Sequence, residues 1–256
     1  MLTKSRPLPQ SLRRTALMTT CLCDVFYDDV ARATVEVLEH LGCELYAPDG
    51  QTCCGQPAFN AGDFNSARRV VRHLLKVFAG EDPVVVPSGS CAAMLFHSAP
   101  ILFENQPELP AVRRLASRVW ELADFIRNAL GVKTWPGRFN ARLAFHRSCH
   151  TRETPSYPAA VELVGSIEGV ELVPFGESEQ CCGFGGTFSV TFPHISGRMG
   201  RLKLENILTA KPDQLLALDM GCLIHLKGIC EKEKIGLPVI HFAQVLRDAL
   251  KNRRSA

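Results

Sequence analysis

The chain has 256 residues, of which 46% are hydrophobic and 21% are charged, and its formal net charge is +3 at pH 7. This composition is typical of a soluble globular protein with room for one large domain or two ordinary ones. The small charge and the lack of a dense Lys/Arg stripe predict that no nucleic acid is a partner. No apolar run approaches the roughly 18 residues of a membrane span, so none is expected.

The first 13 residues are basic and interrupted by prolines, and they lack the apolar stretch of a secretory signal. They predict a loose N-terminal tail. The chain contains 11 cysteines. Without an export signal, this number favours a reducing compartment, in which thiols stay free or bind metal. A cytoplasmic location is therefore expected.

Short apolar runs and helical spacings alternate along the first half of the chain. Strands are expected at residues 15–20, 45–47 and 84–86, and helices between Asp24 and Gly42, at 63–78 and at 111–130. Asp24 is the expected cap of the first helix, and Gly42 its end. Residues 104–110 are polar and contain prolines, which indicates a surface loop.

Trp135, Pro136, Gly137 and Arg138 form the expected boundary, because Pro and Gly together interrupt regular structure. The cycle then restarts, with strands expected at 141–146, 170–175, 215–218 and 239–241, and helices at 159–167, 195–208, from Cys222 and at 242–250. The prediction is an α/β fold of two tandem Rossmann-like parallel-sheet units, residues 14–137 and 138–256, related by a pseudo-two-fold.

Cysteines carry the clearest internal repeat. Cys21, Cys53, Cys54 and Cys91 in the first half recur as Cys149, Cys181, Cys182 and Cys222 in the second, at an offset of 128 residues, or 131 for the last pair. Each of these cysteines follows a predicted strand, and ligands collect at the carboxyl ends of parallel strands. We therefore predict two sites of four cysteines each, one in each half.

Four thiolates are the ligand set of an iron–sulfur cluster, and two [4Fe–4S] clusters are the predicted cofactors. Gly55, Gly183, Gly185 and Gly186 are candidate cofactor-binding residues, because glycine permits positive φ and a close approach of backbone N–H groups to cluster sulfur. Cys91 and Cys222 begin predicted helices, where the dipole favours a thiolate. Tetrahedral zinc is the alternative, although the usual pairs of C-x₂-C knuckles are missing.

Other reactive residues have simpler interpretations. Cys43 and Cys230 are interpreted as buried apolar residues, whereas Cys23 is a possible spare ligand. His146 and His150 are expected to pack or cap rather than to support a metal. Positive charges that could offset a second cluster, but that individually favour a solvated surface, are Arg147, Arg152, Arg198, Arg201 and Lys203.

No Ser-His-Asp set, P-loop or complete dinucleotide fingerprint is present in the sequence, so catalytic residues remain unassigned. The GFGGTF stretch after Cys182 does not match the G-x-G-x-x-G pattern.

The two CCG elements, with a cysteine about 30 residues before each and another about 35 after, resemble the CCG-domain iron–sulfur oxidoreductase family. Within it, the likeness is to the lactate-utilisation branch. It rests on TTCLCD, LEHLGCELYAPDGQTCCGQPAFNAGD, PSGSC, CCGFGGTFSV and ISGRM, and it covers nearly the whole chain after the tail.

This resemblance implies an iron–sulfur electron-transfer subunit of an oxidoreductase complex that oxidises L-lactate to pyruvate together with companion subunits. It implies the eight repeated cysteines as the metal ligands and little activity of the chain alone. Phe184, Phe188 and Phe192 could belong to an exposed docking patch beside the CCG loops. The alternatives are a non-catalytic zinc-binding scaffold, or the iron–sulfur subunit of a dehydrogenase for glycerol 3-phosphate or another 2-hydroxy acid.

The family pattern ends each repeat in C-x₂-C, which supplies a fifth cysteine. Ser88 and Asp219 occupy those two positions in this sequence. A serine hydroxyl is a poor iron ligand and an aspartate a fair one, so four-cysteine [4Fe–4S] clusters are favoured over five-thiolate clusters.

Overall fold

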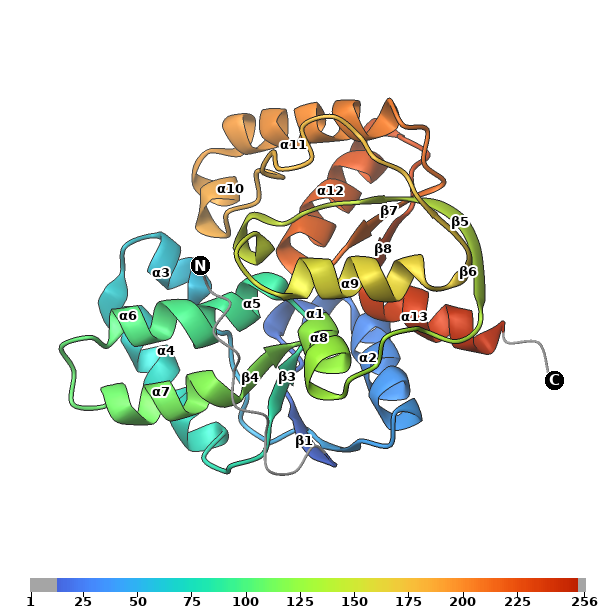
Figure 1. Ribbon diagram of the computed structural model, residues 1–256. Helices are drawn as coiled ribbons and strands as arrows, with labels where there is room; N and C mark the ends of the chain where they lie inside the picture. Colours follow the sequence, from blue (N-terminus) through green and yellow to red (C-terminus); the bar gives the residue numbers. More distant parts are fainter. Residues whose placement is uncertain (1–12, 253–256) are drawn as a thin grey trace.

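Two parallel sheets of four strands each organise the computed structural model, which describes residues 13–252 (Figure 1). The first sheet has the order β2-β1-β3-β4, with β1 Arg14–Leu17, β2 Glu44–Tyr46, β3 Val84–Val86 and β4 Val119–Glu121. The second has the order β6-β5-β7-β8, with β5 Arg138–Phe145, β6 Glu168–Leu172, β7 Gln214–Ala217 and β8 Val239–His241. The predicted tail lies outside the described residues except for Arg13.

Helices connect the strands and cover the sheets. In the first half these are α1 Cys21–Phe26, α2 Asp28–His40, α3 Gln56–Asn60, α4 Phe64–Val77, α5 Gly89–Ala93, α6 Ala99–Leu102, α7 Leu109–Arg118 and α8 Leu122–Asp124. In the second half they are α9 Ser156–Gly165, α10 Thr187–Thr191, α11 Pro193–Leu208, α12 Met220–Glu233 and α13 Phe242–Lys251. Between residues 13 and 252, no helix is both long and apolar enough to cross a membrane.

The two halves have the same topology, because each strand of the first sheet has a counterpart at the same place in the second. Their contacts are also reciprocal. Helix α13 packs on α2 of the first half, and the matching helix α8 packs on α9 of the second half (Figure 1). The predicted fold of two tandem Rossmann-like units related by a pseudo-two-fold is confirmed.

One hydrophobic core belongs to both halves. It contains Val37 and Leu38 of α2, Phe125 after α8, and Phe242 and Leu246 of α13. These side chains are completely buried. Because neither sheet covers this core by itself, the halves depend on each other for the burial of their apolar surface.

The predicted helix at 111–130 is interrupted by a strand. Helix α7 ends at Arg118, and Val119, Trp120 and Glu121 form β4, which pairs in parallel with β3. A strand of three residues that is buried on both faces has no alternating pattern, and its flanking residues keep helical spacing. Its place was therefore decided by pairing with β3 and not by a local signal.

The predicted cap of the first helix is wrong. Thr20 is the cap of α1, and its side chain accepts a hydrogen bond from the N–H of Cys23, whereas Asp24 lies in the first turn. The single expected helix is divided at Tyr27, which has φ of −140° between α1 and α2. Helix α1 is therefore a separate short helix that begins with Cys21.

Glu121 supplies a prediction about pH. It caps α8 by accepting hydrogen bonds from the N–H groups of Ala123 (2.9 Å) and Asp124 (3.3 Å). Burial, together with the nearby Asp124 carboxylate, raises the pKa of Glu121 from 4.5 to about 8. The folded state therefore keeps a proton that the unfolded state releases, and this contribution to stability is lost as the pH rises between these two values.

Glu121→Gln stays neutral and is expected to avoid that loss. In thermal unfolding of the metal-free chain, the Tm of the variant relative to the parent should increase between about pH 5 and pH 8. Exposed Glu39→Gln is the control, for which the difference should stay level. A Glu121→Gln difference that is constant or falls with pH would contradict the assignment.

Candidate metal centres

The first set of predicted ligands comes together at the carboxyl ends of three neighbouring strands. Cys21 begins α1 after β1, Cys53 and Cys54 lie in the loop after β2, and Cys91 lies in α5 after β3. Their thiols contact one another in the order Cys21, Cys53, Cys54, Cys91. Cys21 is exposed, while Cys54 and Cys91 are buried, so this first quartet extends from the surface into the interior.

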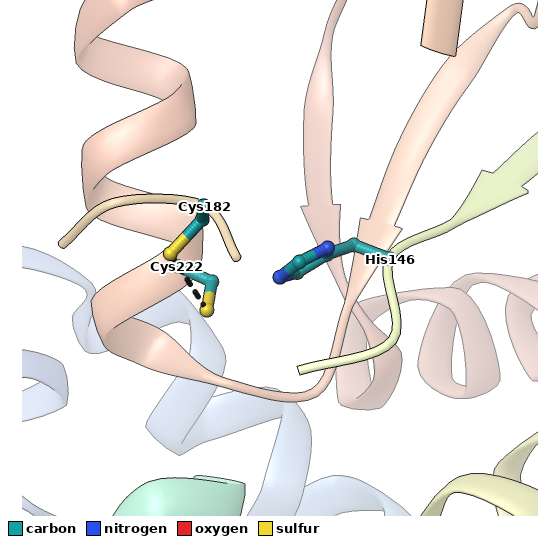
Figure 2. Close-up of side chains that lie close together, drawn as sticks. All are labelled: His146, Cys182 and Cys222. Carbon is teal, nitrogen blue, oxygen red and sulfur yellow. Dashed lines mark hydrogen bonds between the residues drawn. The ribbon is translucent and has the colours of Figure 1, made fainter. Parts of the chain in front are cut away.

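The second set repeats this arrangement. Cys149 lies in the 3₁₀ turn Cys149–Thr151 after β5, Cys181 and Cys182 follow β6, and Cys222 lies in α12 after β7. The thiols contact one another in the same order, from exposed Cys149 to buried Cys222. The Sγ atoms of Cys182 and Cys222 are 3.1 Å apart (Figure 2). We call these two sets the first and the second quartet.

The pKa of the central cysteine in each quartet is lowered by its neighbours. Hydrogen bonds from the Cys21 and Cys54 thiols lower the pKa of Cys53 far below its ordinary value. In the same way, Cys149 and Cys182 lower the pKa of Cys181. The pKa values of the donating thiols are raised, because ionising them would break these hydrogen bonds. Metal binding would release their protons.

Backbone N–H groups also point at the sulfur atoms. Gly55 N–H is 3.5 Å from Cys53 Sγ, Gly183 N–H is 3.3 Å from Cys181 Sγ, and Phe184 N–H is 3.5 Å from Cys182 Sγ. Four converging thiols with N–H donors form a donor set of the kind that holds an iron–sulfur cluster, and the residues present fit that group.

All four candidate glycines have positive φ: +90° at Gly55, +93° at Gly183, +56° at Gly185 and +66° at Gly186. Gly183 is also tightly enclosed. A Cβ atom there would lie 2.6 Å from the carbonyl oxygen of Ser196 and 2.8 Å from Cβ of Met199. At Gly55 the nearest atom would be 3.4 Å away, which is an ordinary contact. The second CCG loop is therefore packed against α11 more closely than the first is against α4.

This difference predicts unequal effects of glycine replacement. Gly55→Ala should destabilise the chain by about 1–2 kcal/mol, the cost of a left-handed backbone. Gly183→Ala should lose roughly 1–3 kcal/mol more, because Ser196 and Met199 must move. Gly62→Ala is the control, with φ of +79° and nothing within 4 Å of an added Cβ. Urea unfolding of the metal-free variants measures all three, and equal losses at Gly55 and Gly183 would contradict the packing argument.

The sequence favoured a packing or capping role for His146, and the structure places this residue beside the second quartet. It directly follows β5, and one of its ring nitrogens lies within 4.8 Å of the sulfur atoms of both Cys182 and Cys222 (Figure 2). The side chain is buried, and among the described residues neither ring nitrogen has a hydrogen-bond partner. Burial lowers its pKa to about 3, so it is a neutral potential ligand. The equivalent position in the first half is Met18, so the repeat gave no signal for it.

The five basic residues have separate positions. Arg147 forms an ion pair with Glu179, and Arg152 donates to the carbonyl of Glu179, so both hold the segment before Cys181. Lys203 is buried and donates to the carbonyls of Glu177 (3.0 Å) and Ser178 (2.8 Å). Arg198 and Arg201 form surface ion pairs with glutamates of α11 and α12. The sequence did not predict that Arg147, Arg152 and Lys203 bind the segment that leads into the second CCG loop.

The remaining cysteines lie in apolar surroundings. Cys43 belongs to the shared core, and Cys230 packs with residues of the second half. Cys23 packs with Met220 and Leu223, and burial raises its pKa to about 12. His150 contacts a quartet member, since its Nδ1 is 3.4 Å from Cys149 Sγ.

Ser88 and Asp219, which occupy the positions of the missing fifth cysteines, contact each other. Ser88 Oγ donates to Asp219 Oδ2 over 3.3 Å, and both residues are buried. Burial favours the neutral acid, but hydrogen bonds from Ser90 and the N–H of Cys222 hold the pKa of Asp219 below its ordinary value. Both carboxylate oxygens accept hydrogen bonds from backbone N–H groups, so neither is directed at a metal.

Apolar side chains are exposed beside the second quartet. They are Val190, Phe192 and Ile195, which are 82%, 51% and 56% exposed, whereas Phe184 and Phe188 are half-buried. Phe184 also lines a cavity of about 460 Å³ between α11 and α12. Of the three phenylalanines suggested for a docking patch, only Phe192 is exposed.

This fold and its two quartets belong to a known class. The family model described as "Cysteine-rich domain", CCG, matches residues 15–96 and 143–227, one match in each half. The chain belongs to this CCG cysteine-rich domain family.

Two bacterial proteins that are similar to this chain have the same name. The chain is 43% identical over 235 residues to "Lactate utilization protein A" of Geobacillus thermodenitrificans (strain NG80-2), a match that covers 91% of this chain and 98% of the relative. It is 39% identical over 242 residues to the protein of that name from Halalkalibacterium halodurans, covering 94% and 99%. A crystal structure of a hypothetical protein from Helicobacter pylori has the same fold, with a TM-score of 0.71 at 13% identity, covering 98% of this chain and 52% of that one.

Proposed function

We propose that the chain is the iron–sulfur subunit of a lactate-oxidising complex, in which it passes electrons between companion subunits. The observation that carries the proposal is the convergence of two equivalent four-thiol quartets in a CCG-family chain. The relatives named for lactate utilisation, matched over nearly their whole length, supply the substrate.

In this proposal, Cys21, Cys53, Cys54 and Cys91 hold one [4Fe–4S] cluster, and Cys149, Cys181, Cys182 and Cys222 hold another. When bound, such clusters accept and release single electrons. The protein supplies ordered thiols, N–H donors from the CCG loops and a buried inner wall. Cys21 and Cys149 bring each quartet to the surface, where a redox partner can approach.

Companion subunits are required because lactate oxidation needs a base and an acceptor for two electrons. No such arrangement occurs at the quartets among the described residues. We expect the exposed group Val190, Phe192 and Ile195 to contribute to docking beside the second quartet. The complex would work in the cytoplasm.

Anaerobic purification of the full chain tests the metal assignment. The expected product is brown, with about eight iron atoms and eight sulfides per chain and a reducible EPR signal. The cluster-loaded chain alone should not turn over L-lactate with an artificial electron acceptor, whereas a complex purified from the native host should. Steady turnover by the isolated chain would contradict the role of a dependent subunit.

A zinc-binding scaffold is the second candidate, and one observation favours it. His146, Cys182 and Cys222 bring three potential ligand atoms within 4.8 Å of one another, which suits a small tetrahedral ion. A colourless protein that contains zinc and no sulfide after anaerobic purification would favour the scaffold. His146→Ala would then lower zinc content.

A further inference from the structure

Asp219 and Ser88 lie where the two halves meet, at equivalent places in the repeat. Asp219 follows β7 and is the N-cap of α12, whereas Ser88 follows β3 and is the N-cap of α5. In each helix the third residue is a quartet cysteine, Cys222 in α12 and Cys91 in α5. Helices α5 and α12 are also in contact with each other. The capped ends of both ligand-bearing helices therefore adjoin at the pseudo-two-fold.

A single carboxylate caps both of these helices. Asp219 Oδ1 accepts a hydrogen bond from the N–H of Cys222, at 3.1 Å, in its own helix. Asp219 Oδ2 accepts one from the N–H of Ser90, at 2.6 Å, in the helix of the other half. Ser90 directly precedes Cys91. The carboxylate thus joins the backbone of a second-quartet ligand to the residue next to a first-quartet ligand.

Ser88 completes an exchange of caps between the halves. Its side chain makes no capping hydrogen bond to its own helix, but its Oγ accepts one from the N–H of Met220, the first residue of α12, at 3.3 Å. The same hydroxyl donates to Asp219 Oδ2. Each N-cap side chain therefore serves the helix of the other half, and Asp219 also serves its own.

This contact gives a physical reason why the two halves have different residues, Ser88 and Asp219, at equivalent positions. Two aspartates at these positions would bring two carboxylates together in a buried site, and their repulsion would prevent both from ionising. One aspartate and one serine satisfy the same N–H groups with a single negative charge. Asp219 is 3% exposed and Ser88 is fully buried, so water does not screen this charge.

We propose that Asp219 is a positioning residue shared by both metal centres, which fixes them relative to each other and lowers the reduction potential of both. This rests on the two-cluster function proposed above. A buried negative charge beside two clusters disfavours the addition of an electron to either. The path from Cys91 through Ser90 and the carboxylate to Cys222 is a short hydrogen-bonded connection between the two centres.

Asp219→Asn tests the proposal, because it removes the charge while keeping the shape. The midpoint potentials of the two clusters would be measured by redox titration of the anaerobically loaded full chain, followed by EPR. Cys91→Ser and Cys222→Ser variants assign each signal to its quartet. The expected result is a shift of both potentials to more positive values. Asp63→Asn, which alters the cap of α4, is the control and should move neither.

The number of affected clusters decides the outcome. A shift of only the second signal would reduce Asp219 to a cap of α12 and overturn the proposal, and so would the absence of any shift. If the variant takes up less iron, a deficit in both quartets supports the proposal, and a deficit confined to the second overturns it. The metal-free Asp219→Asn chain should also unfold at a lower temperature than Asp63→Asn, since caps of two buried helices are weakened. A parent chain without iron and sulfide would instead refute the proposed function.

Discussion

Cys182→Ala is expected to remove the second metal centre and leave the first intact. Cys182 is buried in the middle of the second quartet, where its Sγ contacts that of Cys222 at 3.1 Å and also Cys181. Loss of this thiolate leaves three, too few to hold a four-iron cluster firmly. Iron and sulfide per chain should fall to about half, and the EPR signal assigned to the second quartet should disappear.

The repeat provides the matched variant, Cys54→Ala, which should remove only the first signal. Cys230→Ala is the control for loss of a buried cysteine outside the quartets and should keep both. If Cys182→Ala retained the full iron content, or if Cys230→Ala lost half of it, the ligand assignment would be wrong.

Separation of the chain within residues 135–138 is expected to abolish folding of both pieces. The proposed boundary lies there, yet α13 packs on α2 and α8 packs on α9 across it. The shared core would be opened to water in each piece, and such an exposed apolar surface leads to aggregation. Trp135 adds to this dependence, because its Nε1 donates to the carbonyl of Leu246 over 2.9 Å.

Circular dichroism and hydrogen exchange of the two separate pieces would measure this effect. Each piece alone should lack cooperative unfolding, whereas coexpression of both should restore a complex with the stability of a folded protein. A piece that unfolds cooperatively by itself would show that its own sheet is sufficient. Phe242→Ala in the intact chain is the milder companion test and should cost about 3–5 kcal/mol.

The sequence predicted the parts of the fold that have a strong local signal. The strand at 84–86 and the helix at 63–78 both occur as expected, the helix as α4. β4 was missed because its three residues acquire their role only by pairing with β3. The break at Tyr27 was missed for a similar reason, since both α1 and α2 have helical spacing.

The candidate site residues were also predicted only in part from the sequence. The eight cysteines could be predicted because core packing gives no reason for reactive residues to recur in the same order, six of them at one offset. His146 was not visible, because Met18 stands at the equivalent place and a single histidine on a strand is usually structural. Its nearness to Cys182 and Cys222 depends on how β5, the CCG loop and α12 are packed.

The sequence by itself determined the two α/β units and the repeated order of the eight cysteines, because these depend on spacing along the chain. Only the tertiary structure decided that the halves share a core, that Lys203, Arg147 and Arg152 hold the second loop, and that Ser88 meets Asp219. These features join residues that are far apart in the chain. Their physical cause is the requirement that each half bury its apolar surface and its helix ends against the other.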